Sequence, residues 1–164
     1  MTLGDRIAVL KDGEVQQVAR PLEIYNDPRN TFVAGFLGTP PMNLLHARVL
    51  KKGKMTFLVT GDMELAVPQE MLTSVRALQD KSFTLGIRPE DIDVTTMKPK
   101  GNNMKIRFIE HLGNELLLHF QLDNQEILVT VSQDKCFKEG DIVTLDIHLE
   151  RIHLFDNQGN KIKG

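Results

Sequence analysis

The clearest candidate for specific chemistry is the corner Arg88-Pro89-Glu90-Asp91, which follows the apolar run 83–88. This run (FTLGIR) has the composition of a short β-strand, so Arg88 would end that strand. Pro89 fixes its own φ and restricts the residue before it, which makes the corner stiff. A rigid, exposed corner can present Arg88 to an anion or to a carboxylate of a partner, whereas a structural salt bridge is the alternative. Arg88 and Glu90 are therefore the candidate contacts with a regulatory molecule or partner.

No other group of residues has the spacing of a known catalytic, cofactor or metal site. The sequence contains no GxxxxGK[ST] phosphate loop, no strand that ends in an Asp-Glu pair and no GxSxG elbow. No local motif activates the single Cys136, so we interpret it as an incidental thiol. The five histidines form neither HxH nor HExxH, and His148 and His153 are expected on the surface. We predict no catalytic, cofactor-binding or metal-ligating residue in this chain.

The composition excludes several classes of protein. The chain has 164 residues, a net charge of −2 and a pI of about 6.2, which argues against a basic nucleic-acid module. Eight Phe, one Tyr and no Trp make a stacking platform for single strands improbable. A single cysteine forms no intrachain disulfide and favours a reducing compartment. Charges at Asp5 and Arg6 argue against a signal peptide, and the apolar run 32–38 is too short to span a bilayer.

The elements before residue 39 are expected to be a hairpin and two short helices. Asp12-Gly13 separates the strand-like runs 5–10 and 15–19, and this dipeptide is a strong hairpin signal. A first helix should start at Pro21 and run to about Asn26. A second should start with Asp27 as its N-cap and Pro28 as its first residue, and should end at Gly38. Its apolar face would consist of Phe32, Val33, Phe36 and Leu37.

Thr39-Pro40-Pro41 marks the expected domain boundary, because consecutive prolines make the chain stiff. The later part reads as short strands with one helix over 69–79, and Pro89 should break its strand or confine it to a sheet edge. The expected strands are 43–50, 54–59, 63–67, 83–88, 104–112, 115–122, 126–131 and 142–149. We therefore predict a mainly β fold, a small barrel or sandwich, with a hairpin-plus-helices extension at its N-terminus.

An internal similarity is found at an offset of 60 residues. Thr84, Leu85, Ile87, Glu90 and Ile92 match identical residues at 144, 145, 147, 150 and 152, which is five identities in nine positions. Chance and a true duplication are both open at this point. A duplication would mean two related β lobes, because two copies are too few for a solenoid. From the residues alone, the function stays open between a binding module and a fragment of a larger protein.

The run 2–45, TLGDRIAVLKDGEVQQV…PLEIYNDPRNTFVAGFLGTPPMNLL, resembles a known family. It is similar to the end of the nucleotide-binding domain in ATP-binding subunits of maltose- and glycerol-phosphate-type ABC importers. The segments LGIRPEDI (85–92) and IHLFD (152–156) are similar to the regulatory OB-type (TOBE) domain at the C-terminus of these subunits. The resemblance covers nearly the whole chain. Ala19-Arg20 departs from it, because the family usually has Gly-Thr before the proline at this point.

The resemblance implies a division into residues 1–39, a remnant of the ATPase domain, and residues 42–164, an OB-like TOBE regulatory domain. It also implies that the family's ATP and Mg²⁺ sites lie upstream of Met1, so the chain is expected to be a truncation or to begin at a misassigned start. The chain alone is then no enzyme, although its parent resembles an ABC-transporter ATPase.

The family implies a regulatory and dimerisation role in uptake of a sugar or glycerol phosphate. Its expected partners are a second ATPase subunit, the transmembrane permease subunits and a regulatory protein or small effector, with no nucleic acid. Its expected location is cytoplasmic, at the inner face of the membrane through the permease. The alternative is a stand-alone OB-type module that binds a small oxyanion, although such a binder would not need the N-terminal ATPase remnant.

Overall fold

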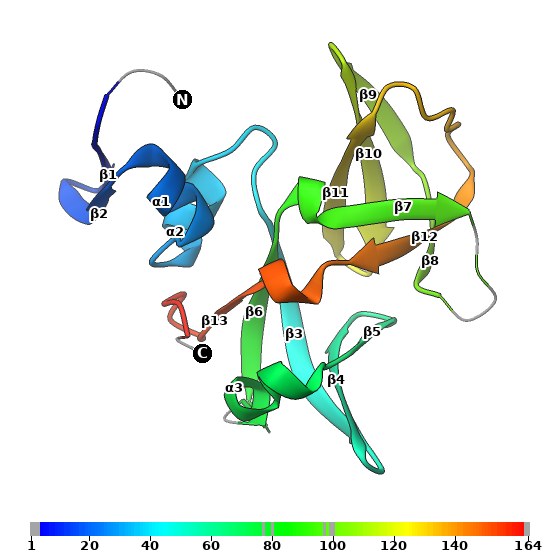
Figure 1. The fold of residues 1–164 in the computed structure, drawn as a ribbon, viewed down its shortest axis with the longest axis horizontal. Helices are drawn as coiled ribbons and strands as arrows, with labels where there is room; N and C mark the ends of the chain where they lie inside the picture. The colour runs from blue at the N-terminus through cyan, green and yellow to red at the C-terminus, as the bar shows by residue number, and fades with distance from the viewer. Residues whose placement is uncertain (1–3, 77, 80, 97, 99–100, 163–164) are drawn as a thin grey trace.

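The computed structural model describes residues 4–76, 78–79, 81–96, 98 and 101–162. It confirms the mainly β fold class, with a hairpin and two short helices at the N-terminal end (Figure 1). The strands form one two-stranded, two three-stranded and one five-stranded sheet. Each of these sheets has two edge strands, so none closes into a barrel on its own.

The N-terminal hairpin forms where the sequence predicted it. β1 (Ile7–Lys11) pairs with β2 (Glu14–Ala19). At the turn, Asp12 and Gly13 have φ values of 50° and 82°, and a type I′ turn requires positive φ at both positions. α1 (Pro21–Asn26) begins at Pro21 as expected. A small apolar cluster that includes the buried side chains of Val9, Ile24 and Val33 holds these elements together.

The second helix, α2 (Thr31–Phe36), begins later than the sequence indicated. Its N-cap is Asn30, whose Oδ1 accepts a hydrogen bond from the backbone N–H of Val33 at 2.9 Å. Asp27 instead ends α1, so the expected start at Asp27-Pro28 is wrong. Asn30 satisfies one of the free N–H groups of the first turn, which is what defines a helix start. Phe36 is 62% exposed, so the predicted apolar face of this helix is covered only in part.

The five-stranded sheet has the order β13-β6-β3-β4-β5. The three strands expected between residues 43 and 67 are present, and β6 lies inside the sheet, so Pro89 ends it without placing it at an edge. The helix expected over 69–79 is shorter, and its residue 77 lies outside the described residues. The elements are β3 (Asn43–Lys52), β4 (Met55–Thr60), β5 (Met63–Ala66), η1 (Gln69–Met71), α3 (Leu72–Arg76), β6 (Ser82–Ile87) and β13 (His153–Phe155).

The two three-stranded sheets have the orders β7-β12-β8 and β11-β10-β9. The single strand expected over 104–112 is wrong, because residues 106–107 turn the chain from one sheet to the other: Ile106 N–H donates to the carbonyl of Asp141 and Arg107 N–H to that of His119. The strand expected over 142–149 ends earlier, at Ile147. The elements are β7 (Ile92–Thr96), β8 (Asn103–Lys105), β9 (Phe108–Leu112), β10 (Glu115–Leu122), β11 (Gln125–Ser132) and β12 (Ile142–Ile147).

The segments that match at an offset of 60 adopt the same local structure. In each, a strand runs into a one-turn 3₁₀ helix and then into a second strand: β6-η2-β7, with η2 at Pro89–Asp91, and β12-η3-β13, with η3 at Leu149–Arg151. Their pairings are reciprocal, because Leu85 faces Leu154 just as Leu145 faces Val94. The two segments are therefore related by a local pseudo-two-fold axis. Each segment contributes one strand to the five-stranded sheet and one to the β7-β12-β8 sheet. The two segments therefore interlock and do not form separate lobes.

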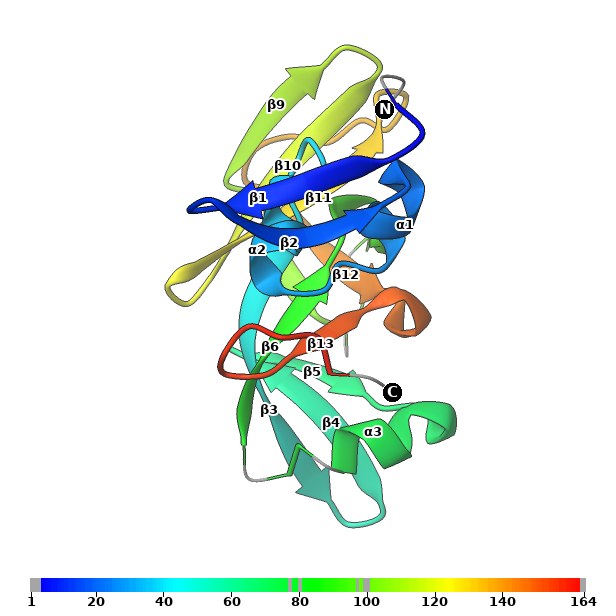
Figure 2. The same cartoon turned by 90° about the vertical axis from the view of Figure 1, so that its left-hand side faces the viewer.

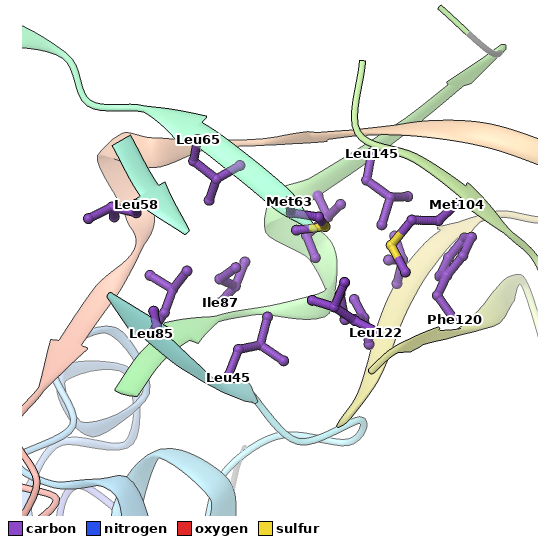
Figure 3. Close-up of a cluster of buried hydrophobic side chains, with 14 of the residues drawn as sticks. Leu45, Leu58, Met63, Leu65, Leu85, Ile87, Met104, Phe120, Leu122 and Leu145 are labelled. Atoms are coloured by element: carbon purple, nitrogen blue, oxygen red, sulfur yellow. The ribbon is translucent and has the colours of Figure 1, made fainter. Parts of the chain in front are cut away.

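One apolar core joins the five-stranded sheet and the two three-stranded sheets. In Figure 3, Leu45 and Leu85 of the five-stranded sheet lie in the same cluster as Phe120 of β10 and Leu145 of β12. Met63 and Met104 lie between them. The side chain of Asn43 adds a polar link, since it donates to the carbonyl and accepts from the N–H of Leu128, both at 2.8 Å. We call the described residues between Asn43 and Phe155 the β module; most of their buried apolar side chains belong to this one core.

Candidate functional site

Arg88 lies between the β module and the N-terminal helices. It follows β6 and is the N-cap of η2, with an extended backbone conformation that the following Pro89 favours. Its side chain is buried, with 2% of its surface exposed. The expectation that an exposed corner presents Arg88 to an anion or a partner is therefore wrong in its geometry, because the guanidinium points into the protein.

The guanidinium of Arg88 binds backbone carbonyls at the ends of both N-terminal helices. Its Nη2 donates to the carbonyl of Tyr25 at 2.7 Å, in the last turn of α1. Its Nη1 donates to the carbonyl of Leu37 at 2.5 Å, at the C-cap of α2, and lies 3.4 Å from that of Ala34. The last carbonyls of a helix have no intrahelical donor and carry partial negative charge. One buried cation therefore caps two helices at once.

Two neighbouring residues shape this pocket for the guanidinium. Arg88 stacks on the ring of Tyr25, with its central carbon 3.7 Å from the ring centre. Gly38 follows α2 with φ of 118°, in the region that favours glycine. A Cβ at this position would lie 2.9 Å from Nη1 of Arg88, so only glycine lets the chain pass this close. We call Tyr25, Leu37, Gly38 and Arg88 the arginine joint.

Arg88 forms no ion pair with any of the described residues. Burial lowers its pKa, and the nearby Tyr25, Glu90 and Asp91 act in the opposite direction. Its Nε has no hydrogen-bond partner in the described part of the chain. A guanidinium nevertheless stays protonated in proteins. The joint therefore depends on carbonyl acceptors, and the salt bridge considered for this residue does not form.

Glu90, the second residue singled out by the sequence, remains at the surface. The hydroxyl of Tyr25 donates a hydrogen bond to its carboxylate. Burial raises the pKa of Tyr25 to about 12, and the hydrogen bond and charge of Glu90 add to the effect. Glu90 thus supports the joint from outside, while its exposed carboxylate stays accessible. The structure brings Arg88 and Glu90 to the same place but gives them different surroundings.

A groove of about 570 Å³ runs along the joint and is lined by residues of both parts of the chain. Asp91 forms an ion pair with Arg151 at 2.9 Å, and Asp27 one with Lys161. The ring of His153 also lines it, and burial together with the charges of Lys161 and Arg88 lowers the pKa of His153 to about 4. His153 is therefore neutral at physiological pH, and it is half-buried, not on the surface as expected.

The C-terminal turn attaches the N-terminal helices at a second point. Thr31 N–H donates to the carbonyl of Gly159 at 2.8 Å, and Lys161 N–H to that of Arg29 at 2.9 Å. Figure 2 shows this turn next to α2. Arg88 therefore holds the C-terminal ends of α1 and α2, while the 156–161 turn holds the start of α2 and the loop before it.

A larger groove of about 790 Å³ lies between the β4–β5 turn and β8, and no sequence motif predicted it. Met63, Met104 and Leu122 form its floor, while Lys105 and Asp123 stand among the charged residues at its rim. Elsewhere in the described residues, no three His, Cys, Asp or Glu side chains are grouped to hold a metal ion. Cys136 is exposed. The arginine joint therefore remains the most specific arrangement of polar groups.

The chain matches two domain families that share a segment. Residues 38–92 match the MalK OB fold domain, and residues 85–155 match the TOBE domain. The overlap, residues 85–92, includes Arg88 and η2, the first of the two matching 3₁₀ helices. A solved structure of the cytoplasmic molybdate-binding protein ModG has a TM-score of 0.54 with this chain, covering 68% of this chain and 94% of ModG. At 17% identity, this likeness concerns the fold alone.

Known proteins are similar to the chain over nearly its whole length. It is 34% identical to the oligosaccharides import ATP-binding protein MsmX of Bacillus subtilis, over 96% of this chain and 44% of MsmX. It is also 34% identical to the trehalose/maltose import ATP-binding protein MalK of Thermococcus litoralis, over 98% of this chain and 45% of that protein. The chain thus spans less than half the length of these relatives. These matches confirm the resemblance: the chain carries the MalK OB fold and TOBE domains, and it is similar to ABC-importer ATP-binding subunits over nearly its whole length.

Proposed function

We propose that this chain is the regulatory and dimerisation module of an ATP-binding subunit. The subunit would belong to an importer that takes up a sugar or a glycerol phosphate. In this proposal it neither binds nor hydrolyses ATP, and the preceding part of the full subunit holds ATP and Mg²⁺. The names of the relatives refer to import of oligosaccharides and of trehalose or maltose, and they support a sugar as the cargo.

The observation that carries the proposal is the arginine joint. Arg88 binds the carbonyl ends of α1 and α2, which belong to the segment that resembles the end of the ATPase domain. The 156–161 turn binds the start of α2 and the loop between the two helices. A displacement of these helices must therefore move the β module or break buried hydrogen bonds. Such a rigid connection is what a regulatory domain needs in order to sense or restrain an ATPase domain.

The partners of the module follow from this role. They are a second copy of the subunit, the permease subunits and a regulatory protein or small effector, for which the exposed Glu90 beside the joint is a contact. The protein would lie in the cytoplasm, attached to the membrane through the permease. In the described residues, no helix combines the length and apolar character needed to cross a membrane.

A chimera of MsmX tests the proposal. In it, residues 1–164 replace the region of MsmX that they match, and oligosaccharide uptake is compared with that of MsmX lacking the region. We expect the chimera to restore uptake, and Arg88→Met to reduce uptake while nucleotide binding stays unchanged. Arg107→Met is the matched control, because Arg107 is exposed and makes only a 3.4 Å contact with Gln121. Full uptake in the Arg88→Met chimera, or no restoration by a folded wild-type chimera, contradicts the proposal.

The small-oxyanion module is the second candidate, and the ModG-like fold is the observation in its favour. The arginine joint weighs against it, because both Nη atoms of Arg88 are occupied by backbone carbonyls. Calorimetric titration of the chain with molybdate distinguishes the two. Saturable binding tighter than about 1 mM supports the oxyanion module. No measurable heat supports the regulatory module.

A further inference from the structure

The core-facing side of β3 continues past the end of the apolar core. Side chains alternate along a strand, so Ala47, Val49 and Lys51 point to the same face of the five-stranded sheet. Ala47 is buried, Val49 is half-buried against the core, and Lys51 is exposed. α3 contributes the buried Val75 to the same core. Between α3 and the β3–β4 hairpin lies a groove of about 600 Å³, called the basic groove below.

The basic groove is lined by side chains that donate hydrogen bonds. Lys51 and Lys54 come from the hairpin, and Arg76 comes from the last turn of α3. Thr56, which faces Lys51 from β4, and Gln79 add neutral donors. None of the described residues that line the groove carries a carboxylate. Ammonium and guanidinium groups donate hydrogen bonds and accept none, so this set of side chains suits a negatively charged oxygen ligand.

The cations of the basic groove are not neutralised by the protein residues that the structure describes. Within this part of the chain, Lys51, Lys54 and Arg76 form no ion pair, whereas the neighbouring Lys52 pairs with Glu64 at 2.6 Å. The two grooves described above differ in this respect, because each is lined by three carboxylates as well as by cations. Cations that share one groove repel one another, and a bound anion would relieve that repulsion.

The size and the walls of the groove indicate which anion it would hold. A phosphate monoester has three acceptor oxygens and a charge of about −1.5 to −2 at pH 7, so it can engage several cations at once. The half-buried Val49 and Leu72 also line the groove, and they offer apolar contact to the organic part of such an ester. The volume lies within the range of about 300–1,000 Å³ that is typical of small-molecule sites.

We propose that the basic groove binds a small organic phosphate ester. The inference rests on the proposed function, in which a small effector acts on the module, and it adds a site and a chemical class for that effector. The β3–β4 hairpin and α3 lie at the end of the molecule away from α1 and α2 (Figures 1 and 2). The ester would therefore bind without displacing Arg88 from the arginine joint.

Nuclear magnetic resonance titration of the intact chain with glucose 6-phosphate tests the site. We expect saturable binding with a Kd of about 0.1–1 mM, and shifts at the backbone amides of Val49 and Thr56. Glucose should cause no shift, because it lacks the charge. Inorganic phosphate should bind about tenfold more weakly, since it lacks the organic part, and burial of two methylene-sized groups accounts for a factor of that size.

Two double variants separate the groove from the overall charge of the chain. Lys51→Gln combined with Lys54→Gln should weaken glucose 6-phosphate binding at least tenfold, because it removes two of the three cations. Lys135→Gln combined with Lys138→Gln removes two exposed lysines that do not line the groove, and it should leave the Kd unchanged. Both change the net charge by the same amount, so a general electrostatic effect would weaken binding equally in the two.

Phosphatidic acid presents the same phosphate monoester on a lipid, so flotation with its vesicles distinguishes a membrane surface from a soluble ester. We expect no more binding to these vesicles than to phosphatidylcholine vesicles. Four results overturn the proposal: no saturation with glucose 6-phosphate, equal binding of inorganic phosphate, equal weakening in the two double variants, or binding to the vesicles alone. These outcomes are independent of uptake by the MsmX chimera, so failure here and failure of the proposed function can be told apart.

Discussion

Replacing Arg88 by methionine should release the N-terminal helices from the β module. Methionine keeps the apolar stem but removes the donors to the carbonyls of Tyr25 and Leu37. Hydrogen bonds to charged groups contribute about 1.5–3 kcal/mol each, so two of them amount to about 3–6 kcal/mol. Relief of the desolvation that now penalises the buried guanidinium offsets part of this loss. We expect a net loss of about 2–4 kcal/mol, or about 5–10 °C in Tm.

The assay can be specific to the joint, because Tyr25 is the only tyrosine and the chain has no tryptophan. Its near-ultraviolet circular dichroism depends on the ring being held against Arg88. In Arg88→Met this signal should weaken and be lost early in a urea titration, while the far-ultraviolet β signal persists. The pKa of Tyr25, raised to about 12 in the wild type, should also fall toward 10 as the ring becomes exposed.

Two further variants decide whether the fork of donors matters or only the charge. Arg88→Lys keeps the charge but has no planar fork, so it should lie between wild type and Arg88→Met. Arg107→Met removes an exposed arginine of the same module and should leave both the Tyr25 signal and the urea midpoint unchanged. A Tyr25 signal and unfolding free energy in Arg88→Met within about 0.5 kcal/mol of wild type, the range of ordinary surface substitutions, would refute the capping argument.

Three other changes test neighbouring parts of the structure. Gly38→Ala should cost about 1–3 kcal/mol in urea denaturation, because φ is 118° and the new Cβ would lie 2.9 Å from Arg88; unchanged stability would contradict the close approach. Asn43→Ala should cost about 1–3 kcal/mol, because it removes the partner of two partly buried backbone groups of Leu128; hydrogen exchange at the Leu128 amide would show whether the loss is local. Folding lowers the pKa of His153 from 6.5 to about 4, so its contribution to stability is present above pH 6.5 and is lost as the pH falls toward 4. His153→Gln should flatten the pH dependence in that window, and an unchanged slope would count against it.

Local signals predicted the elements whose causes lie within a few residues. The Asp12-Gly13 turn and the start of α1 at Pro21 were correct because φ preferences act at the residue itself. The start of α2 was misplaced because two capping candidates, Asp27 and Asn30, stand three residues apart. A contact far along the sequence distinguishes the two candidates in the folded chain. Asn30 also forms an isolated antiparallel β-bridge with Asn160.

The arginine joint was beyond sequence reasoning for a different reason. The corner at Arg88 was found, but its surroundings were predicted from the rule that arginines lie at the surface. Its actual acceptors are backbone carbonyls 51 and 63 residues away, and a carbonyl has no sequence signature. The one usable signal was Gly38, a glycine after a predicted helix. It indicates a close approach of the chain without showing to what.

The two segments that match at an offset of 60 explain why, in the described residues, a joint exists on one side of the β module only. Under the pseudo-two-fold axis, Arg88 corresponds to His148, and Asp93 corresponds to His153. At the first of these positions, His148 lies 2.8 Å from the carboxylate of Asp93. The two polar side chains of that corner therefore pair with each other. In the other half the place of that carboxylate is taken by His153, which is neutral near pH 7. Arg88 has no acid to pair with there, and its donors are free for the helices. The same local fold thus serves as a closed corner in one copy and as the attachment point of the N-terminal segment in the other.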